Sequence, residues 1–141
     1  EPHFVKSIGD SGPLPIYQKK NYTMVEAKNF SAVIEGMRRV VNEPGGTGSA
    51  ARLKDIMVCG KTGTVQNSQG EDHSVFIAFA PKNNPKIAIA VFIENAGFGG
   101  TWAAPIESLV IEKYLNRKIK DKDKEKRIIE AKLSNLKEIP E

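Results

Sequence analysis

The first long pattern of apolar and polar residues in the chain has a helical period. Between residues 26 and 43, apolar side chains recur every three or four positions, which places them on one face of a helix. These residues are Phe30, Val33, Ile34, Met37, Val40 and Val41. The run stops at Pro44-Gly45-Gly46-Thr47-Gly48, where proline and glycine disfavour a helix. We therefore predict a helix over 26–43 whose apolar face is turned to a core, followed by a glycine-rich connector.

Three later runs have the composition and the boundaries of β-strands. They cover residues 58–66, 74–80 and 86–94. The polar connection 67–72 and the short turn 82–85 both suit hairpins, so we predict a three-stranded antiparallel meander. The second and third runs are apolar at nearly every position. We expect both of their faces to be covered, with helices on the sides of the sheet.

The two ends of the chain carry shorter patterns. Phe4–Ile8 alternates apolar and polar residues and predicts a short strand, with a turn over 9–13 and irregular chain to Tyr22. After the glycine-rich segment 97–100, Thr101 is a candidate cap for a helix that contains Pro105 in its first turn. The expected apolar stripe of that helix is formed by Ile106, Leu109, Val110 and Tyr114.

From Arg117 onward the chain changes to alternating lysine and acidic residues. A charge run of this kind is typical of a solvated face or a frayed tail. Ile129, Leu133 and Leu136 have the spacing of a weak further helix. We therefore divide the chain into a domain portion, 1–116, and a charged tail, 117–141.

Composition and charge exclude several classes of protein. The chain has 141 residues, 40% of them hydrophobic and 27% charged, which fits one soluble domain. The net charge of +4 is concentrated in the tail, so we expect no nucleic-acid partner. No run approaches the roughly 18 to 20 apolar residues of a membrane span. The chain starts at Glu1 with no signal peptide, so we expect it to be a piece of a longer protein.

The single cysteine and the two histidines predict no metal centre. Cys59 has no partner for an internal disulfide, and its apolar neighbours favour a buried structural thiol. His73 has only Asp72 beside it, and His3 is the one other histidine. One imidazole and one carboxylate do not make a metal site, so we expect His73 to be hydrogen-bonded at a strand start. No cofactor is expected.

Candidate chemistry is concentrated in Lys61-Thr62-Gly63-Thr64. The Lys61 ammonium supplies positive potential for a carboxylate and can tune a neighbouring proton. Gly63 has no side chain, so a substrate backbone can lie close to the strand. We expect Thr62 and Thr64 to point to opposite faces of the sheet if the strand is extended, although a twisted edge with a following glycine can bring both hydroxyls near one rim. The Thr64 N–H is then free to stabilise a developing oxyanion.

Other interpretations of the same residues are weaker. The tetrapeptide alone is also compatible with a polar, solvent-facing strand next to a turn. Gly60-Lys61-Thr62 resembles the end of a nucleotide-binding phosphate loop, but that motif needs glycine where Asp55 stands and a helix starting at the lysine. The Gly45–Gly48 run lacks the helix start of a phosphate cradle, so we interpret it as a connector.

Several blocks around the tetrapeptide together resemble a known family. The blocks are residues 59–66, 73–81, 84–88, 94–95, 99–100 and 103–105, with weaker likeness at 2–6 and 35–49. They resemble the C-terminal part of the transpeptidase domain of class B penicillin-binding proteins, and within that class the penicillin-binding protein 2 group. The likeness covers roughly 1–116, and K-T-G is one of the family's three signature boxes.

The resemblance implies a fold and an activity. The fold would be α+β, an antiparallel sheet flanked by helices, as part of the penicillin-binding transpeptidase and β-lactamase-like fold. The family's enzymes cross-link peptidoglycan stem peptides through an acyl-serine intermediate and are acylated by β-lactam antibiotics. They sit in the bacterial inner membrane with the catalytic domain in the periplasm, and other cell-wall synthesis proteins would be partners of the parent protein.

Each residue of the tetrapeptide acquires a role by the same resemblance. Lys61 would orient the serine of the S-x-N box and attract the substrate carboxylate. Thr62 and Thr64 would hydrogen-bond that carboxylate beside Gly63. The Thr64 N–H would complete the oxyanion hole. Lys61 and Thr64 are thus the expected catalytic residues, and Thr62, Gly63 and Thr64 the expected substrate-binding residues.

The family's other two boxes are missing from this sequence. No S-x-N occurs, and the only S-x-x-K, Ser134 to Lys137, follows K-T-G in the charged tail, in the wrong order. The chain therefore has no candidate nucleophile, and we expect a fragment that is inactive alone. The alternatives are a non-catalytic module that binds peptides or a partner, and a β-lactam sensor or carboxypeptidase relative. An uncovered sheet edge would favour self-association through strands.

Overall fold

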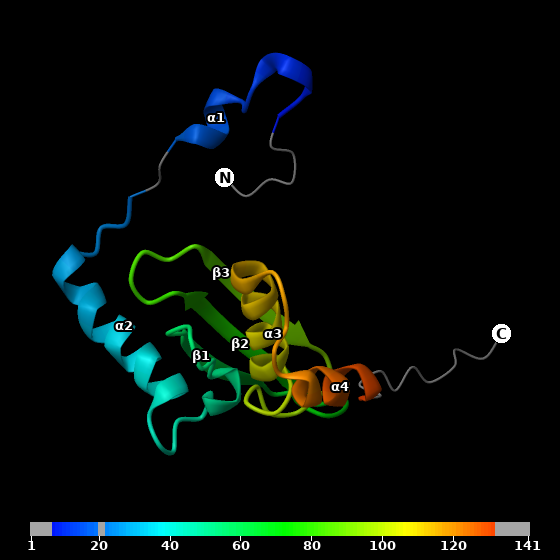
Figure 1. Ribbon diagram of the computed structural model, residues 1–141. Coiled ribbons are helices and arrows are strands. Elements are labelled where there is room, and N and C mark those ends of the chain that lie inside the picture. Colours follow the sequence, from blue (N-terminus) through cyan, green and yellow to red (C-terminus); the bar gives the residue numbers. More distant parts are fainter. Residues whose placement is uncertain (1–6, 20–21, 132–141) are drawn as a thin grey trace. The chain divides into compact units, whose positions relative to one another are not determined.

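The computed structural model describes residues 7–19 and 22–131, and the chain divides into two compact units, Glu1–Phe30 and Ser31–Glu141. The first unit contains a 3-10 turn, η1 (Gly9–Ser11), and a short helix, α1 (Pro15–Gln18) (Figure 1). The expected irregular path to Tyr22 is therefore wrong over α1, where proline stands at the first helical position. Most of the expected strand Phe4–Ile8 lies outside the described residues, and its last two positions are not in a strand.

The second unit is built on a three-stranded antiparallel sheet in the order β1-β2-β3 (Figure 1). The strands are β1 (Cys59–Val65), β2 (His73–Ala80) and β3 (Ile87–Ile93). The meander, the α+β class and each strand's place in the chain are confirmed. The apolar runs and their turn residues were sufficient, because each hairpin pairs neighbouring segments.

Only one face of this sheet is covered within the described residues. Phe76, Ala78 and Ala80 of β2 are buried in the core, together with residues of helix α3 (Ala103–Asn116). On the opposite face, Ile77 is 46% exposed and Phe92 is 54% exposed. The expectation that both faces of β2 and β3 are covered is therefore wrong within the second unit, because none of the helices described in that unit packs on the second face.

The face through which helix α3 packs is predicted only in part by its apolar residues: Leu109 is buried as expected. Val110 and Tyr114 are about half exposed, whereas Glu107, Ser108 and Ile111 are buried. Small residues at the start of the helix, Ala103 and Ala104, are also buried against the sheet. The expected cap at Thr101 is wrong as well: the position before the helix is Trp102, and it makes no side-chain cap.

The predicted first long helix is confirmed as α2 (Ala27–Asn42), but its apolar face is only partly covered. Val41 is buried in the core, whereas Val33 remains 61% exposed. The end of the helix is fixed to the sheet, because the Asn42 side chain donates to the Val58 carbonyl at 2.8 Å. Hydrogen bonds from Arg38 and Lys82 lower the pKa of Glu35 to about 2. The bond from Lys82 also ties α2 to the turn after β2.

The first part of the charged tail forms a helix, α4 (Lys122–Glu130). Asp121 caps it by accepting a hydrogen bond from the Lys124 N–H at 2.9 Å. The Lys124 ammonium donates to Ser108 Oγ of α3, and the Arg127 guanidinium lies over the Trp102 ring. Leu133 and Leu136, assigned to the same weak helix, lie outside the described residues. Among the helices that are described, none is long and apolar enough to cross a membrane.

Candidate functional site

The Lys61-Thr62-Gly63-Thr64 segment lies in β1, at one edge of the sheet as described. Thr62 is opposite Phe76 and Thr64 opposite Ser74, both on the covered face. Residues two apart in a strand share a face, so both hydroxyls lie on the same side and Lys61 and Gly63 on the other. The two threonines therefore reach one rim through simple alternation, and the expectation that they point to opposite faces is wrong, because residues two apart in a strand share a face.

Lys61 is exposed, and no carboxylate among the described residues pairs with it. Its ammonium donates to the neighbouring carbonyl of Thr62 at 2.7 Å. None of the ion pairs formed by residues 7–19 and 22–131 includes Lys61. An unpaired ammonium on an accessible edge strand is available to an external anion.

One border of the motif is the loop between β3 and α3. A Cβ atom at Gly99 would lie 2.1 Å from the Val75 carbonyl oxygen and 2.6 Å from that of Gly63, so only glycine permits this approach. Buried Ser74 fixes the loop: its hydroxyl donates to the Phe98 carbonyl at 3.0 Å and accepts from the Ala103 N–H at 3.2 Å. The neighbouring Phe98 side chain is 72% exposed and adds an apolar group to this border.

The other border is the glycine-rich segment after α2, which sequence reasoning treated only as a connector. The Thr47 and Thr62 hydroxyl oxygens are 2.9 Å apart and share a hydrogen bond. Local sequence patterns carry no signal for a contact of this kind, because it joins a loop to a strand 15 residues later. Thr47 is thus a site residue that sequence reasoning missed.

The contacts of His73 and Cys59, the two other candidate residues, indicate structural roles. His73 begins β2, and its Nδ1 accepts from the Asn95 N–H at 3.0 Å, as expected for a hydrogen-bonded histidine. Cys59 is buried, and burial raises the pKa of its thiol, which favours the structural interpretation. Lys61 and Thr62 lie within a strand and not at a helix start, which argues against a nucleotide phosphate loop. The described residues contain no cluster of three metal-ligating side chains.

The family follows from these features and from comparison with known proteins. A family model described as the penicillin binding protein transpeptidase domain matches residues 1–112. The chain belongs to this family. The match includes the edge strand, both bordering loops and most of α3.

Two relatives locate this transpeptidase-domain chain within the family. It is 35% identical to the peptidoglycan D,D-transpeptidase MrdA of Haemophilus influenzae, over 87% of this chain and 22% of that protein. It is similar to the crystal structure of Pseudomonas aeruginosa PBP2 in complex with WCK 5153, with a TM-score of 0.59 and 36% identity over 67% of this chain and 20% of that one. These relatives confirm the resemblance to the penicillin-binding protein 2 group.

A third comparison brings in an acylated structure. Penicillin-binding protein A of M. tuberculosis, solved as a ceftriaxone acyl-enzyme complex, superimposes with a TM-score of 0.56 and 31% identity, over 64% of this chain and 22% of that one. This transpeptidase-domain chain spans about a fifth of the length of these relatives.

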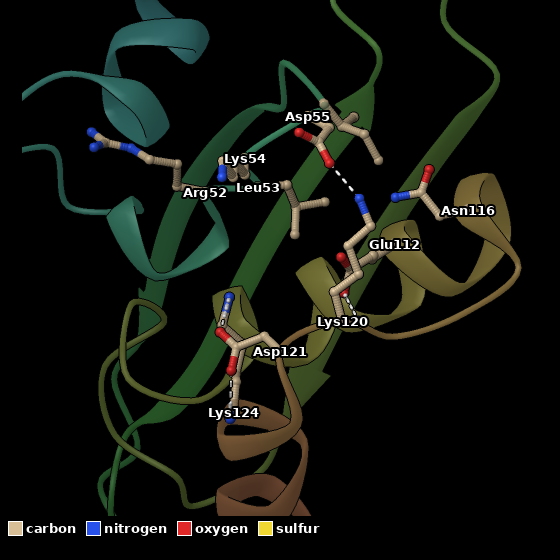
Figure 2. A pocket seen from close by; sticks show the side chains of 10 residues that line it. Arg52, Leu53, Lys54, Asp55, Glu112, Asn116, Lys120, Asp121 and Lys124 are labelled. Carbon is tan, nitrogen blue, oxygen red and sulfur yellow. Dashed lines mark hydrogen bonds and ion pairs between the residues drawn. The ribbon is translucent and has the colours of Figure 1, made fainter.

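The second unit also contains a cavity of about 660 Å³, and Figure 2 shows the side chains that line it. It is bounded by the segment before β1, the end of α3 and the start of α4. Its charges are largely matched within the chain: the Lys120 ammonium pairs with Asp55, and the Lys120 N–H donates to Glu112 at 3.0 Å. None of the K-T-G-T residues lines it. We interpret this cavity as the junction that attaches α4 to the domain.

Proposed function

We propose that this chain is the C-terminal part of the transpeptidase domain of a peptidoglycan D,D-transpeptidase, which cross-links stem peptides through an acyl-serine intermediate. The observation that carries the proposal is the K-T-G-T segment on an accessible edge strand, with an unpaired Lys61 and both threonine hydroxyls on one rim. The likeness to a named peptidoglycan D,D-transpeptidase supports the same reaction.

In this proposal the stem peptide lies along the edge of β1. Its terminal carboxylate accepts hydrogen bonds from the hydroxyls of Thr62 and Thr64. Lys61, whose side chain leaves the strand on the opposite face, adds positive potential at the same edge. Gly63 leaves room for the peptide backbone. The Thr64 N–H donates to the oxyanion that develops when the acyl carbonyl is attacked, and one such donor contributes about 3 kcal/mol to transition-state stabilisation.

The nucleophile belongs to a part of the parent protein outside residues 1–141. Serine of an S-x-x-K box would attack the D-Ala-D-Ala carbonyl or a β-lactam ring, and Lys61 would orient the serine of the S-x-N box. The parent protein would be held in the inner membrane, with this domain in the periplasm beside other cell-wall synthesis proteins.

Labelling with a fluorescent penicillin tests the proposal. The full-length protein is expected to form a covalent, heat-stable adduct visible on a denaturing gel, whereas residues 1–141 alone remain unlabelled because the serine is missing. An unlabelled full-length protein would contradict the proposed function and favour a non-catalytic module of the same fold. A labelled 1–141 chain would show that the nucleophile lies within it.

We also propose that residues 1–141, when isolated, self-associate through the sheet. Strand β3 has no further strand partner among the described residues, and Ala90 and Phe92 on its open face are exposed. Exposed edges with apolar faces favour pairing with another chain. Sedimentation velocity at increasing concentration should show dimers, and Ala90→Lys should reduce them. A monomer at all concentrations would refute this proposal.

A further inference from the structure

The glycine-rich loop after α2 is held firmly where it meets the K-T-G-T strand. The Gly46 N–H donates to the Glu43 carbonyl at 3.2 Å, and the Gly48 N–H donates to the Val40 carbonyl at 3.0 Å. Between them, the Thr47 carbonyl lies where a Cβ atom at Gly100 would be only 2.5 Å away. Thr47 is therefore fixed between the end of α2 and the loop that precedes α3, and its place opposite Thr62 is built into the fold.

The hydrogen bond between Thr47 and Thr62 has two possible directions with different chemical consequences. The two Oγ1 atoms are 2.9 Å apart, and either hydroxyl could donate. Each hydroxyl has one proton and two acceptor lone pairs. If Thr62 donated to Thr47, it would present only lone pairs to a substrate carboxylate, which is itself only an acceptor. If Thr47 donates, Thr62 keeps its own proton for the carboxylate.

A carboxylate selects the second direction. Hydrogen bonds to an ionised acceptor are shorter and roughly twice as strong as those between neutral groups. The pair of hydroxyls therefore reorients so that Thr47 donates to Thr62 and Thr62 donates to the bound anion. A hydroxyl that already accepts a hydrogen bond is also polarised, which strengthens its own donation.

We propose that Thr47 is a positioning residue for substrate binding, donating its hydroxyl proton to Thr62 so that the Thr62 proton is directed at the carboxylate of the stem peptide or β-lactam. The inference rests on the proposed function, because it assumes that Thr62 binds this carboxylate. It assigns a role to the Gly45–Gly48 connector that neither its composition nor its position in the chain indicates.

The test measures the second-order rate of acylation by benzylpenicillin in the full-length protein. Thr47→Val removes the hydroxyl and keeps the side-chain volume, so acylation should slow by roughly fivefold, the effect of one hydrogen bond. Thr47→Ala should give the same loss without adding any atom that could clash. Thr47→Ser retains the hydroxyl and should stay within about twofold of the wild type. Ser68→Ala, at an exposed hydroxyl in the connection between β1 and β2, should leave the rate unchanged.

A double-mutant cycle separates this role from general support of the loop. If Thr47 acts through Thr62, then Thr47→Val should cost nothing further in a Thr62→Val background. Three results would overturn this inference and leave the proposed function standing. They are additive losses in the cycle, failure of Thr47→Ser to preserve the rate, and a wild-type rate in both Thr47→Val and Thr47→Ala. A wild-type protein that penicillin does not acylate would overturn the proposed function and this inference with it.

Discussion

Replacing Lys61 with alanine in the full-length protein is expected to reduce β-lactam acylation by at least 100-fold, to a level that a penicillin-labelling gel does not detect. The Lys61 ammonium is exposed and unpaired with any described carboxylate, so in the proposed site its charge is available to the ligand. Removing one preorganised group that stabilises developing charge typically costs 10²- to 10³-fold in rate. Stopped-flow or quenched acylation kinetics with benzylpenicillin would give the value.

Two further variants show whether the loss of acylation in Lys61→Ala depends on the position of the lysine or on its charge. Lys86, an exposed lysine just before β3, offers a matched control, and Lys86→Ala should be acylated at the wild-type rate. Lys61→Arg keeps the positive charge but replaces a compact ammonium with a larger planar group, so it should recover only part of the rate. An unchanged rate in Lys61→Ala would show that the K-T-G-T strand is not a wall of the acylation site.

Local sequence patterns were sufficient for the elements that form from neighbouring residues. The helix Ala27–Asn42 and the three strands follow from a period of three to four residues, from apolar runs and from the turns between them. Hairpins pair adjacent segments, so the meander needs no information from distant parts of the chain. The K-T-G-T strand could be located for the same reason.

Surfaces that depend on distant packing could not be predicted in this way. Phe92 and Val33 are apolar, yet they are exposed within this part of the chain, because burial requires a partner and not only an apolar side chain. Helix α3 shows the converse, since Val110 is exposed and Glu107 is buried. Small residues of the helix, Ala103 and Ala104, are buried as well as Leu109, so a count of apolar positions finds only part of the buried face.

The site residues also fall into those that the sequence predicts and those that only the structure shows. The roles proposed for Lys61, Thr62 and Thr64 come from a motif that is contiguous in sequence, so one amino-acid sequence is enough to recognise it. Thr47 contributes through a side-chain contact between a loop and a strand, and Ser74 through hydrogen bonds to a loop about 25 residues later. Such contacts leave no periodic trace in one sequence, and coordinates are needed to find them.

Glu107 of α3 has an acidic side chain in a buried position. Replacing it with leucine is expected to stabilise the protein. Its side chain is fully buried, and neither carboxylate oxygen has a hydrogen-bond partner among the residues that the structure describes. Burial is the larger influence and raises the pKa of Glu107 from 4.5 to about 8, whereas the Ala78 backbone acts in the opposite direction with a smaller effect. Glutamate is almost never fully buried unless it is paired.

The raised pKa has a definite consequence for stability. The folded state holds the proton between about pH 4.5 and 8, whereas the unfolded chain has released it, so the free energy of unfolding falls as the pH rises through this window. The stability associated with protonated Glu107 is complete below the unfolded pKa and lost above the folded one. At one pKa unit per 1.36 kcal/mol, the loss by pH 7 is on the order of 3 kcal/mol.

Melting temperatures of the full-length protein between pH 5 and 9 would measure this effect. Glu107→Leu, which keeps the side chain near its original size, should melt several degrees above the wild type at pH 8 and show a smaller advantage at pH 5. Glu107→Gln should also lose the pH dependence, since it cannot ionise. A wild-type protein whose stability does not fall relative to these variants as the pH rises would show that Glu107 is not buried as a neutral acid.

Glu112 provides the matched control, because it lies on the same helix and is also buried, but it has a partner. Its Oε2 atom accepts the Lys120 N–H at 3.0 Å. Glu112→Leu should therefore lower the free energy of unfolding by about 1 to 3 kcal/mol, because a backbone donor loses its acceptor. Opposite signs for the same substitution five residues apart would show that a hydrogen-bond partner, and not burial alone, decides whether a carboxylate destabilises this helix.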